Sequence, residues 1–229
     1  MTIKLDLWLW PLDQATDASC TAYLSADEVD RAARFVHASH ASQFRAARGR
    51  MRKILSGYLN RDPASLNFGY HPQGKPYLKD GPLFNLSHSG RLAALVVGGD
   101  CELGIDIEAF RPVEHDIADR FFSPIEVMSL NAIPPDQWVD GFFRCWTRKE
   151  AVIKALGPGL SVPLNSFDVT LLPDAKAQVS RIEGQKTGPD DWKLIHLDIR
   201  GDMVGAIAVA SGKRQLSVSV RQGSVKLAL

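Results

Sequence analysis

Two carboxylates separated by a single residue occur in the segment GIDIE, where Asp106 and Glu108 alternate with Ile105 and Ile107. In a β-strand, residues i and i+2 point to the same face, so we expect the two carboxylates side by side and the isoleucines opposite. Hard oxygen ligands on a rigid strand suit Mg²⁺, which keeps coordination positions for water and substrate phosphate. Two acidic residues without a third are more often the solvated face of an edge strand, so a third carboxylate is needed to favour a metal site.

The segment CWTRKEAVIKALGPGL, residues 145–160, supplies a third carboxylate. Glu150 and Lys154 are four residues apart, which on a helix makes them neighbours and by itself indicates a surface ion pair of about 0.3–0.5 kcal/mol. The helix is largely apolar around them, through Trp146, Ala151, Ile153 and Leu156. Partly buried charges need partners. A metal shared with Asp106 and Glu108 would compensate Glu150, and a phosphate would compensate Lys154. Lys149 is interpreted as structural or solvated.

Two polar turns have the composition of phosphate sites. FNLSHSG, residues 84–90, sets Ser87 and His88 ahead of an apolar strand. Adjacent Ser and His seldom reach nucleophile–base geometry and no G-x-S-x-G motif is present, so hydroxyls and an imidazole that hold a phosphate are favoured over a hydrolase. QGKPYL, residues 73–78, holds Lys75 between a glycine and a proline. Lys75 alone is typical of an ordinary turn, with phosphate binding as the alternative.

The elements that must position these residues follow from the hydrophobic pattern. Alternating and apolar runs predict strands, and helical spacing predicts helices with a Pro-Pro break at 134 and 135. Strands are expected within 3–10, 83–98, 102–110, 167–172, 192–199, 203–211 and 216–221, and helices within 26–36, 41–59, 114–131 and 137–156. Residues 1–108 and 109–229 thus each combine strands with one long helix. The predicted fold class is α+β, with two similar halves.

The composition limits which partners and which cellular compartment are expected. The chain has 229 residues, 45% hydrophobic and 23% charged, with a formal net charge of +1. This balance gives no electrostatic reason to expect nucleic acid or an anionic membrane as partner. Nothing approaches a signal peptide or a membrane span, so we expect a cytoplasmic protein. The thiols of Cys20, Cys101 and Cys145 are widely spaced without a C-x-x-C pair, which predicts reduced and buried cysteines.

The order of these motifs resembles a known family. FNLSHSG, then GIDIE, then FFRCWTRKEAVIKALGPGL is similar to the 4′-phosphopantetheinyl transferases of the surfactin-synthetase type, whose signature is W-x-x-K-E-A-x-x-K. RFFSPIE and GKPYL resemble the segments around these motifs, and DEVDRAARF and AARGRMRKIL resemble the N-terminal half of the family. The resemblance covers most of the chain.

The resemblance implies a pseudo-twofold α+β protein whose halves close over coenzyme A. Residues 1–108 would contact the adenosine end, and residues 109–229 would supply the catalytic helix and the carrier-protein contacts. Such enzymes move the phosphopantetheine arm of coenzyme A to a serine of an apo acyl, peptidyl or aryl carrier protein. They use Mg²⁺, with Mn²⁺ as an alternative, and release adenosine 3′,5′-bisphosphate. A chain with both halves is expected to be a monomer.

The resemblance also assigns roles by position. Asp106, Glu108 and Glu150 would be the Mg²⁺ ligands. Coenzyme A phosphates would be held by Lys154, Lys75, Ser87, His88, Arg48 and Arg31. Glu126, in FFSPIE, matches a family glutamate proposed as the base for the carrier serine, with an exposed residue after a helix start as the alternative. Glu150 and a metal-bound water are the other candidates for the base. The chain departs from the family at Glu28, where some members carry a coenzyme-binding lysine.

Two other functions use the same residues. A metal-dependent phosphohydrolase would use the carboxylates to activate water and would hydrolyse coenzyme A or nucleotides without a protein acceptor. A non-catalytic carrier-protein binding module would keep the fold without needing the acidic residues. The presence of all three carboxylates counts against the second alternative.

Overall fold

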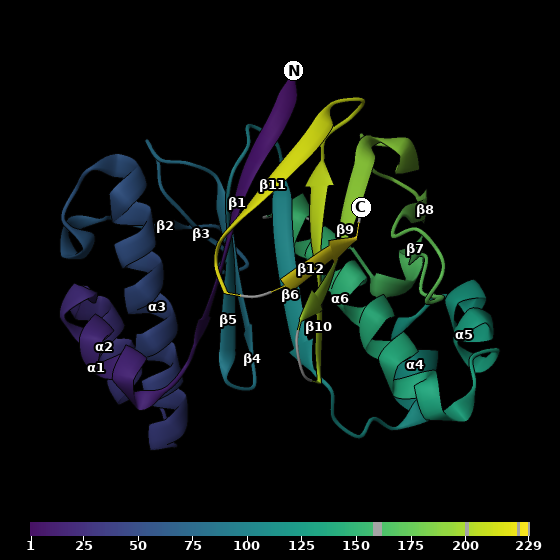
Figure 1. Cartoon of the computed structure of the whole chain (residues 1–229), viewed down its shortest axis with the longest axis horizontal. Coiled ribbons are helices and arrows are strands. Elements are labelled where there is room, and N and C mark those ends of the chain that lie inside the picture. Colours follow the sequence, from purple (N-terminus) through teal and green to yellow (C-terminus); the bar gives the residue numbers. More distant parts are fainter. Residues whose placement is uncertain (158–161, 200–201, 224, 229) are drawn as a thin grey trace.

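The computed structural model describes residues 1–157, 162–199, 202–223 and 225–228, and it has four layers (Figure 1). Two four-stranded sheets lie face to face in the middle of the molecule. Helix α3 (Ala38–Leu59) covers the outer face of the first sheet, and helix α6 (Trp138–Leu156) covers the outer face of the second. The predicted α+β class is confirmed.

The first sheet has the strand order β11-β1-β5-β4, and the second has the order β12-β9-β10-β6. The first is formed by β1 (Thr2–Pro11), β4 (Phe84–Ser89), β5 (Leu92–Gly98) and β11 (Gln215–Gln222). The second is formed by β6 (Leu103–Ala109), β9 (Trp192–Ile199), β10 (Met203–Ala210) and β12 (Val225–Ala228). Strand β11 runs parallel to β1, and the other pairings are antiparallel. A strand from the end of the chain therefore completes the sheet that contains the N-terminal strand.

The central strands explain the layering, because they are apolar on both faces. On β5, Leu95 and Val97 pack against α3, whereas Ala94 and Val96 belong to the core between the sheets. Burial of apolar area on both faces stabilises the sheet stack by about 25 cal/mol per Å² removed from water. Each sheet is thus held between one long helix and the other sheet.

The N-terminal helices and a short hairpin surround α3. They are α1 (Gln14–Cys20), α2 (Ala26–Ala33), β2 (Gly69–Tyr70) and β3 (Pro76–Tyr77). Helix α2 begins with a capping box in which Ser25 and Glu28 exchange hydrogen bonds with each other's backbone. This cap places the buried Glu28 carboxylate against α3, where it contacts Arg48 and Arg52.

In the C-terminal half, the expected helical region 114–131 is two helices, α4 (His115–Phe121) and α5 (Pro124–Asn131). The break has a local cause, because Pro124 can begin a helix but cannot donate a hydrogen bond inside one, and Ser123 caps the new helix. The expected strand 167–172 ends early, as β7 (Phe167–Val169), and pairs with β8 (Val179–Ile182), which the sequence pattern did not predict.

The chain ends helix α6 at Gly157, whose φ of 71° is a conformation that favours glycine. The next glycine of the segment 145–160, Gly159, lies outside the described residues. Cys20 and Cys145 are buried free thiols, as predicted, and Cys101 is half-buried. Within the described ranges, no helix is both long and apolar enough to cross a membrane.

Candidate functional site

The two sheets meet at a seam between β4 and β6 that side chains close. Three polar residues at alternate positions of β4 accept hydrogen bonds from backbone N–H groups of β6. The pairs are Asn85 Oδ1 with Ile105 (2.9 Å), Ser87 Oγ with Ile107 (3.3 Å) and Ser89 Oγ with Ala109 (3.1 Å). The seam places the hydroxyls of β4 beside the carboxylates of β6, as both sets alternate with period two.

Helix α6 approaches the same strand at Gly104. A Cβ atom at this position would lie 2.5 Å from the Ala155 nitrogen and closer still to the carbonyl oxygen of Ala151. Only a glycine therefore allows the helix backbone to rest directly on β6. This contact brings the helix face that carries Glu150 and Lys154 over the carboxylates of β6.

A hollow of about 400 Å³ opens at this junction. Its lining is Leu86, Ser87, His88, Asp106, Glu108, Trp146, Glu150 and Lys154. Six of the site residues predicted from the sequence thus lie together, although they come from β4, β6 and α6. Trp146, one of the apolar positions of this helix, also lines the hollow.

Asp106 is the most buried acid of the hollow. Its Oδ1 atom accepts hydrogen bonds from Lys154 Nζ (2.6 Å) and Ser87 Oγ (2.9 Å). Its Oδ2 atom is buried and has no hydrogen-bond partner among the described residues. Burial raises the pKa of Asp106 above its ordinary value, while the charge of Lys154 and its hydrogen bond oppose this rise. The site thus contains a buried carboxylate oxygen that accepts no hydrogen bond from the described residues, although its carboxylate pairs with Lys154 through Oδ1.

The other acids of the hollow repel Asp106 and each other. Burial and the negative charge of Asp106 raise the pKa of Glu150, against the effect of Lys154. Glu108 accepts hydrogen bonds from Ser89 Oγ (2.6 Å) and from Arg111 (2.9 Å). A cation placed among these groups would relieve the repulsion.

The donor set fits a divalent hard cation in kind. Carboxylate oxygens are the ligands that Mg²⁺ prefers, and the buried Oδ2 atom of Asp106 accepts no hydrogen bond from the described residues. In the ranges described by the structure, no group of three or more His, Cys, Asp or Glu side chains is already arranged to hold a metal ion. In the described part of the chain the three acids are therefore not preorganised as a metal site, and the charge that contacts Asp106 is the ammonium of Lys154.

The positive groups of the site lie on both sides of the end of α6. Lys154 Nζ faces the hollow, while Lys75 Nζ donates to the carbonyl oxygens of Lys154 (2.6 Å) and Leu103 (3.0 Å). Lys75 lines a second cavity of about 400 Å³, beside Tyr77. Burial, helped by the charge of Lys154, lowers the pKa of Lys75 to about 8. Desolvation and the same lysine charge also lower the pKa of His88.

Two predicted phosphate ligands lie elsewhere. Arg48 is buried and donates to Glu28 Oε1 (2.8 Å) and to Tyr70 Oη (2.6 Å). Arg31 lies over the Phe44 ring, with 5.2 Å between its guanidinium carbon and the ring centroid. Neither is among the described residues that line the two cavities. The roles of Arg31 and Arg48 toward an anion therefore remain predictions, and the contacts of Arg48 give it a structural partner instead.

We expect Glu28→Gln to lower the free energy of unfolding by about 3–5 kcal/mol, because it leaves two buried guanidinium groups without their carboxylate. Arg52 also donates to Glu28, and both residues of that pair are 2% exposed at the side chain. Urea denaturation followed by circular dichroism measures the change. Asp100→Asn is the control, because it breaks an exposed pair with Arg214 and should change stability by less than about 1 kcal/mol. A loss for Glu28→Gln as small as that of the control would contradict the prediction.

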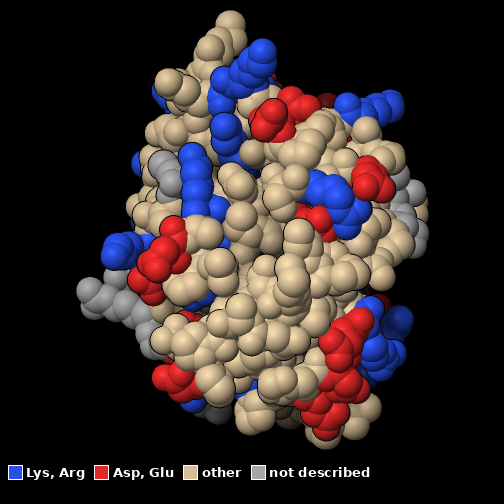
Figure 2. Space-filling view, turned by 90° about the vertical axis from the view of Figure 1, so that its right-hand side faces the viewer, with Lys and Arg blue, Asp and Glu red and all other residues tan. Residues whose placement is uncertain are grey.

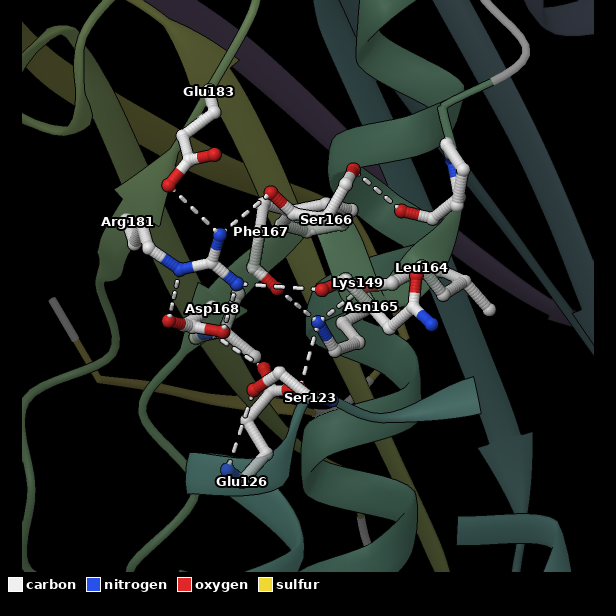
Figure 3. Close-up of polar contacts among 12 residues, drawn as sticks. Ser123, Glu126, Lys149, Leu164, Asn165, Ser166, Phe167, Asp168, Arg181 and Glu183 are labelled. Atoms are coloured by element: carbon white, nitrogen blue, oxygen red, sulfur yellow. Dashed lines mark hydrogen bonds and ion pairs between the residues drawn. The ribbon is translucent and has the colours of Figure 1, made fainter. Parts of the chain in front are cut away.

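Glu126 is not where either interpretation of the sequence expected it. It is buried, so it is not an exposed residue, and it does not line the hollow. Its carboxylate accepts from the backbone N–H groups of Ser123 (2.9 Å) and Val169 (2.8 Å) and pairs with Lys149 (2.8 Å). Figure 3 shows this cluster beside α6. Its role as a base stays a prediction, and its contacts do not support that role.

Two contributors to the site were missed by the sequence analysis. Asn85 closes the seam and Ser89 holds Glu108, yet neither was selected. FNLSHSG was expected to be a turn, but residues 84–89 form strand β4, so the signal that was overlooked is the alternation of polar residues along this strand. Such alternation in a strand next to an acidic strand indicates side-chain bridging between sheet edges.

Comparison with known proteins gives consistent results. Residues 102–209 match the family model of the 4′-phosphopantetheinyl transferase superfamily. The 4′-phosphopantetheinyl transferase HetI of Nostoc sp. is 40% identical over 90% of this chain and 88% of its own length. A 4′-phosphopantetheinyl transferase of Bacillus subtilis is 38% identical over 77% of this chain and 79% of its own. The 4′-phosphopantetheinyl transferase Sfp of Bacillus subtilis strain 168 is 34% identical over 74% of this chain and 76% of its own.

Proposed function

The chain belongs to the 4′-phosphopantetheinyl transferase superfamily, and we propose that it transfers the phosphopantetheine arm of coenzyme A to a serine of an apo carrier protein. The other product would be adenosine 3′,5′-bisphosphate, and the reaction would depend on Mg²⁺ or Mn²⁺. The observation that carries the proposal is the hollow that Asp106, Glu108, Glu150 and Lys154 line together. Three acids and a lysine at one point match the demands of cleaving a pyrophosphate.

In this proposal, Asp106, Glu108 and Glu150 hold the divalent cation. When bound, the cation would neutralise the charge that develops on the pyrophosphate oxygens. Lys154 faces the same point and would bind a phosphate oxygen once it leaves Asp106. Ser87 and His88 border the hollow and would donate hydrogen bonds to phosphate. Glu150 lines the hollow and Glu126 does not, so Glu150 and a metal-bound water are the candidates there for the base that takes the serine proton.

An apo acyl or peptidyl carrier protein is the proposed partner. Ile125 and Met128 of α5 are 55% and 66% exposed, and Phe121 of α4 is also exposed. The Phe121 ring contacts Trp146, which lines the hollow, with 5.7 Å between the centroids. Figure 2 faces this side of the molecule and shows a broad uncharged area bordered by acidic and basic clusters. The exposed side chains of Phe121, Ile125 and Met128, connected to the hollow through Trp146, support protein docking there.

The arrangement of the halves is also part of the proposal. Residues 1–108 would contact the adenosine end, and residues 109–229 would carry the catalytic helix, with a pseudo-twofold axis relating the halves. A long helix on the outer face of each sheet supports this relation. We further propose that the enzyme acts as a monomer in the cytoplasm, without a nucleic-acid or membrane partner.

The proposed function is tested by incubating the protein with coenzyme A, Mg²⁺ and an apo carrier protein, followed by intact mass spectrometry of the carrier. A mass gain equal to phosphopantetheine is expected, and it should disappear with a chelator or with a carrier whose serine is replaced by alanine. Hydrolysis of coenzyme A without any gain on the carrier would favour a phosphohydrolase and overturn the proposal.

Lys75→Met is expected to weaken the binding free energy of coenzyme A by about 1.5–3 kcal/mol, the usual contribution of a charge-assisted hydrogen bond. We assign Lys75 to the 3′-phosphate, so the loss should be smaller for 3′-dephospho-coenzyme A. Because the pKa of Lys75 is about 8 in the free protein, its ammonium loses its proton as the pH rises through 8. Binding at pH 9 must restore that proton, so wild-type affinity should fall by about tenfold between pH 7 and 9.

Calorimetric titration of both ligands at the two pH values measures these effects. Lys79→Met, at an exposed lysine after the same turn, is the control and should change neither affinity nor its pH dependence. Equal losses for the two ligands in Lys75→Met would refute the assignment to the 3′-phosphate. An unchanged pH dependence in that variant would show that another group is responsible for it.

A further inference from the structure

Lys149 is a charged residue with no exposed surface, one position before Glu150 in the catalytic helix. Its side chain is 0% exposed, and Nζ forms an ion pair with Glu126 at 2.8 Å. The same atom donates to the carbonyl oxygens of Leu164 (2.6 Å) and Phe167 (2.5 Å), as Figure 3 shows. An ammonium group has three donors, so the hydrogen-bonding capacity of Lys149 is fully used inside the protein.

Glu126 connects the other segments of this cluster. Its two oxygens accept from Ser123 N at the start of α5 and from Val169 N at the end of β7. On the far side of the same segment, Arg181 pairs with Asp168 at 2.6 Å and donates to the carbonyl oxygen of Ser166 (Figure 3). The pair of Glu126 and Lys149 thus joins α6, the start of α5 and residues 164–169 at one buried point.

The position of Lys149 on the helix links this point to the hollow. Successive residues on a helix are about 100° apart, and residues four apart share a face. Cys145 and Lys149 therefore lie on one face, toward Glu126, whereas Trp146, Glu150 and Lys154 lie on the next face, toward the hollow. A rotation of about 10° about the helix axis would move an outer side-chain atom by about 1 Å.

The close packing of α6 on β6 at Gly104 limits such a rotation, but it does not single out one orientation of the side chains toward the hollow. Hydrogen bonds to two fixed carbonyl groups and to a carboxylate are directional and require one rotation of α6. We propose that Glu126 and Lys149 are positioning residues for the transfer reaction, which set the rotation of α6 that points Glu150 and Lys154 at Asp106. This inference rests on the proposed function, and it gives Glu126 a role through Lys149 in place of proton transfer from the serine.

Lys149→Met keeps the length of the side chain and removes its donors, so we expect kcat to fall ten- to a hundredfold, as for other residues that orient a metal ligand. Leu55→Ala is the matched control, because Leu55 is fully buried on α3, in the other helical layer, and the variant is destabilised by a cavity. Rates are compared at a temperature where circular dichroism shows both variants folded. Equal losses of kcat in the two variants would mean that Lys149 contributes only stability, which overturns the inference.

A second readout does not depend on turnover. Electron paramagnetic resonance counts free Mn²⁺, and the dissociation constant of Mn²⁺ with coenzyme A present should rise about tenfold in Lys149→Met but not in Leu55→Ala. If wild-type protein modifies no carrier, the proposed function fails, while this measurement still tests whether Lys149 orients the acids. An unchanged Mn²⁺ dissociation constant in Lys149→Met would count against positioning.

The double variant Glu126→Gln with Lys149→Met separates an effect on stability from an effect on the orientation of α6. Removing both charges avoids leaving one of them unpaired in the core, so the melting temperature should recover relative to Glu126→Gln alone. The bonds to Leu164 and Phe167 remain absent, so kcat should stay as low as in Lys149→Met. Recovery of kcat together with the melting temperature would overturn the inference, even if the single variant Lys149→Met did not fold.

Discussion

Replacing Glu150 by glutamine is expected to lower the rate of phosphopantetheine transfer by about 10² or more, the scale of losing a principal electrostatic stabiliser. Glu150 is in the hollow with Asp106 and Glu108, and burial together with the charge of Asp106 raises its pKa. The amide keeps the size of the side chain but removes the charge that would hold a cation. It also removes a negative charge that burial and Asp106 make unfavourable, so the fold should be retained.

The comparison needs an acid of the same helix outside the hollow. Asp140 lies near the start of α6, with a side chain 46% exposed and a weak pair to Arg144 at 3.4 Å. Asp140→Asn should therefore keep wild-type activity. Initial rates at a range of Mg²⁺ concentrations, with folding checked by circular dichroism, provide the measurement. If Glu150→Gln keeps near-normal activity at saturating Mg²⁺, then Glu150 is neither a metal ligand nor the acceptor of the serine proton.

The sequence predicted the site best where the pattern was local. The period-two acids of β6 and the i, i+4 pair of α6 needed only the geometry of one element, and both lie in the hollow. Their convergence was inferred from the need of buried charges for partners and from the resemblance to the family, since no local pattern indicates that Gly104 lets α6 rest on β6. The close approach is a property of two elements that are distant in the sequence.

The sequence did not predict which charges pair with which. Arg48 was expected to face a phosphate, but Glu28 is 20 residues away in the sequence and accepts its hydrogen bond in the folded protein. Glu126 was assigned to the serine, or to solvent, without any signal that Lys149 would meet it. Buried charges depend on partners contributed by other elements, so their roles cannot be derived from one segment.

The same limit applies to strand pairing. The strands β1, β9, β10 and β11 were expected near their observed positions, because their alternation is a local property. The parallel pairing of β11 with β1 joins residues more than 200 positions apart and has no sequence signature. The sequence therefore predicts the positions of these strands, whereas the pairing of β11 with β1 is seen only in the structure.

Lys154→Met is expected to change two measurements in opposite directions. In the free protein, Lys154 Nζ lies 2.6 Å from Asp106 Oδ1 and 3.1 Å from Ser87 Oγ, where it compensates a buried carboxylate. A divalent cation on Asp106 would meet this ammonium. Two unit charges about 4 Å apart repel by about 4 kcal/mol at an effective dielectric constant of 20, and a divalent cation doubles this repulsion. Removing the ammonium should therefore tighten Mn²⁺ binding in the absence of coenzyme A by about tenfold or more.

Transfer should nevertheless fall by about 10², because the variant has lost the positive charge that would stabilise the phosphate during pyrophosphate cleavage. Electron paramagnetic resonance titration of Mn²⁺ and initial rates of carrier modification measure the two effects on the same preparation. The fold should persist, since Asp106 keeps its hydrogen bond from Ser87. A variant that binds Mn²⁺ more weakly than wild type would show that Lys154 does not compete for Asp106. Unchanged transfer would show that Lys154 only balances a buried charge and does not act on the phosphate.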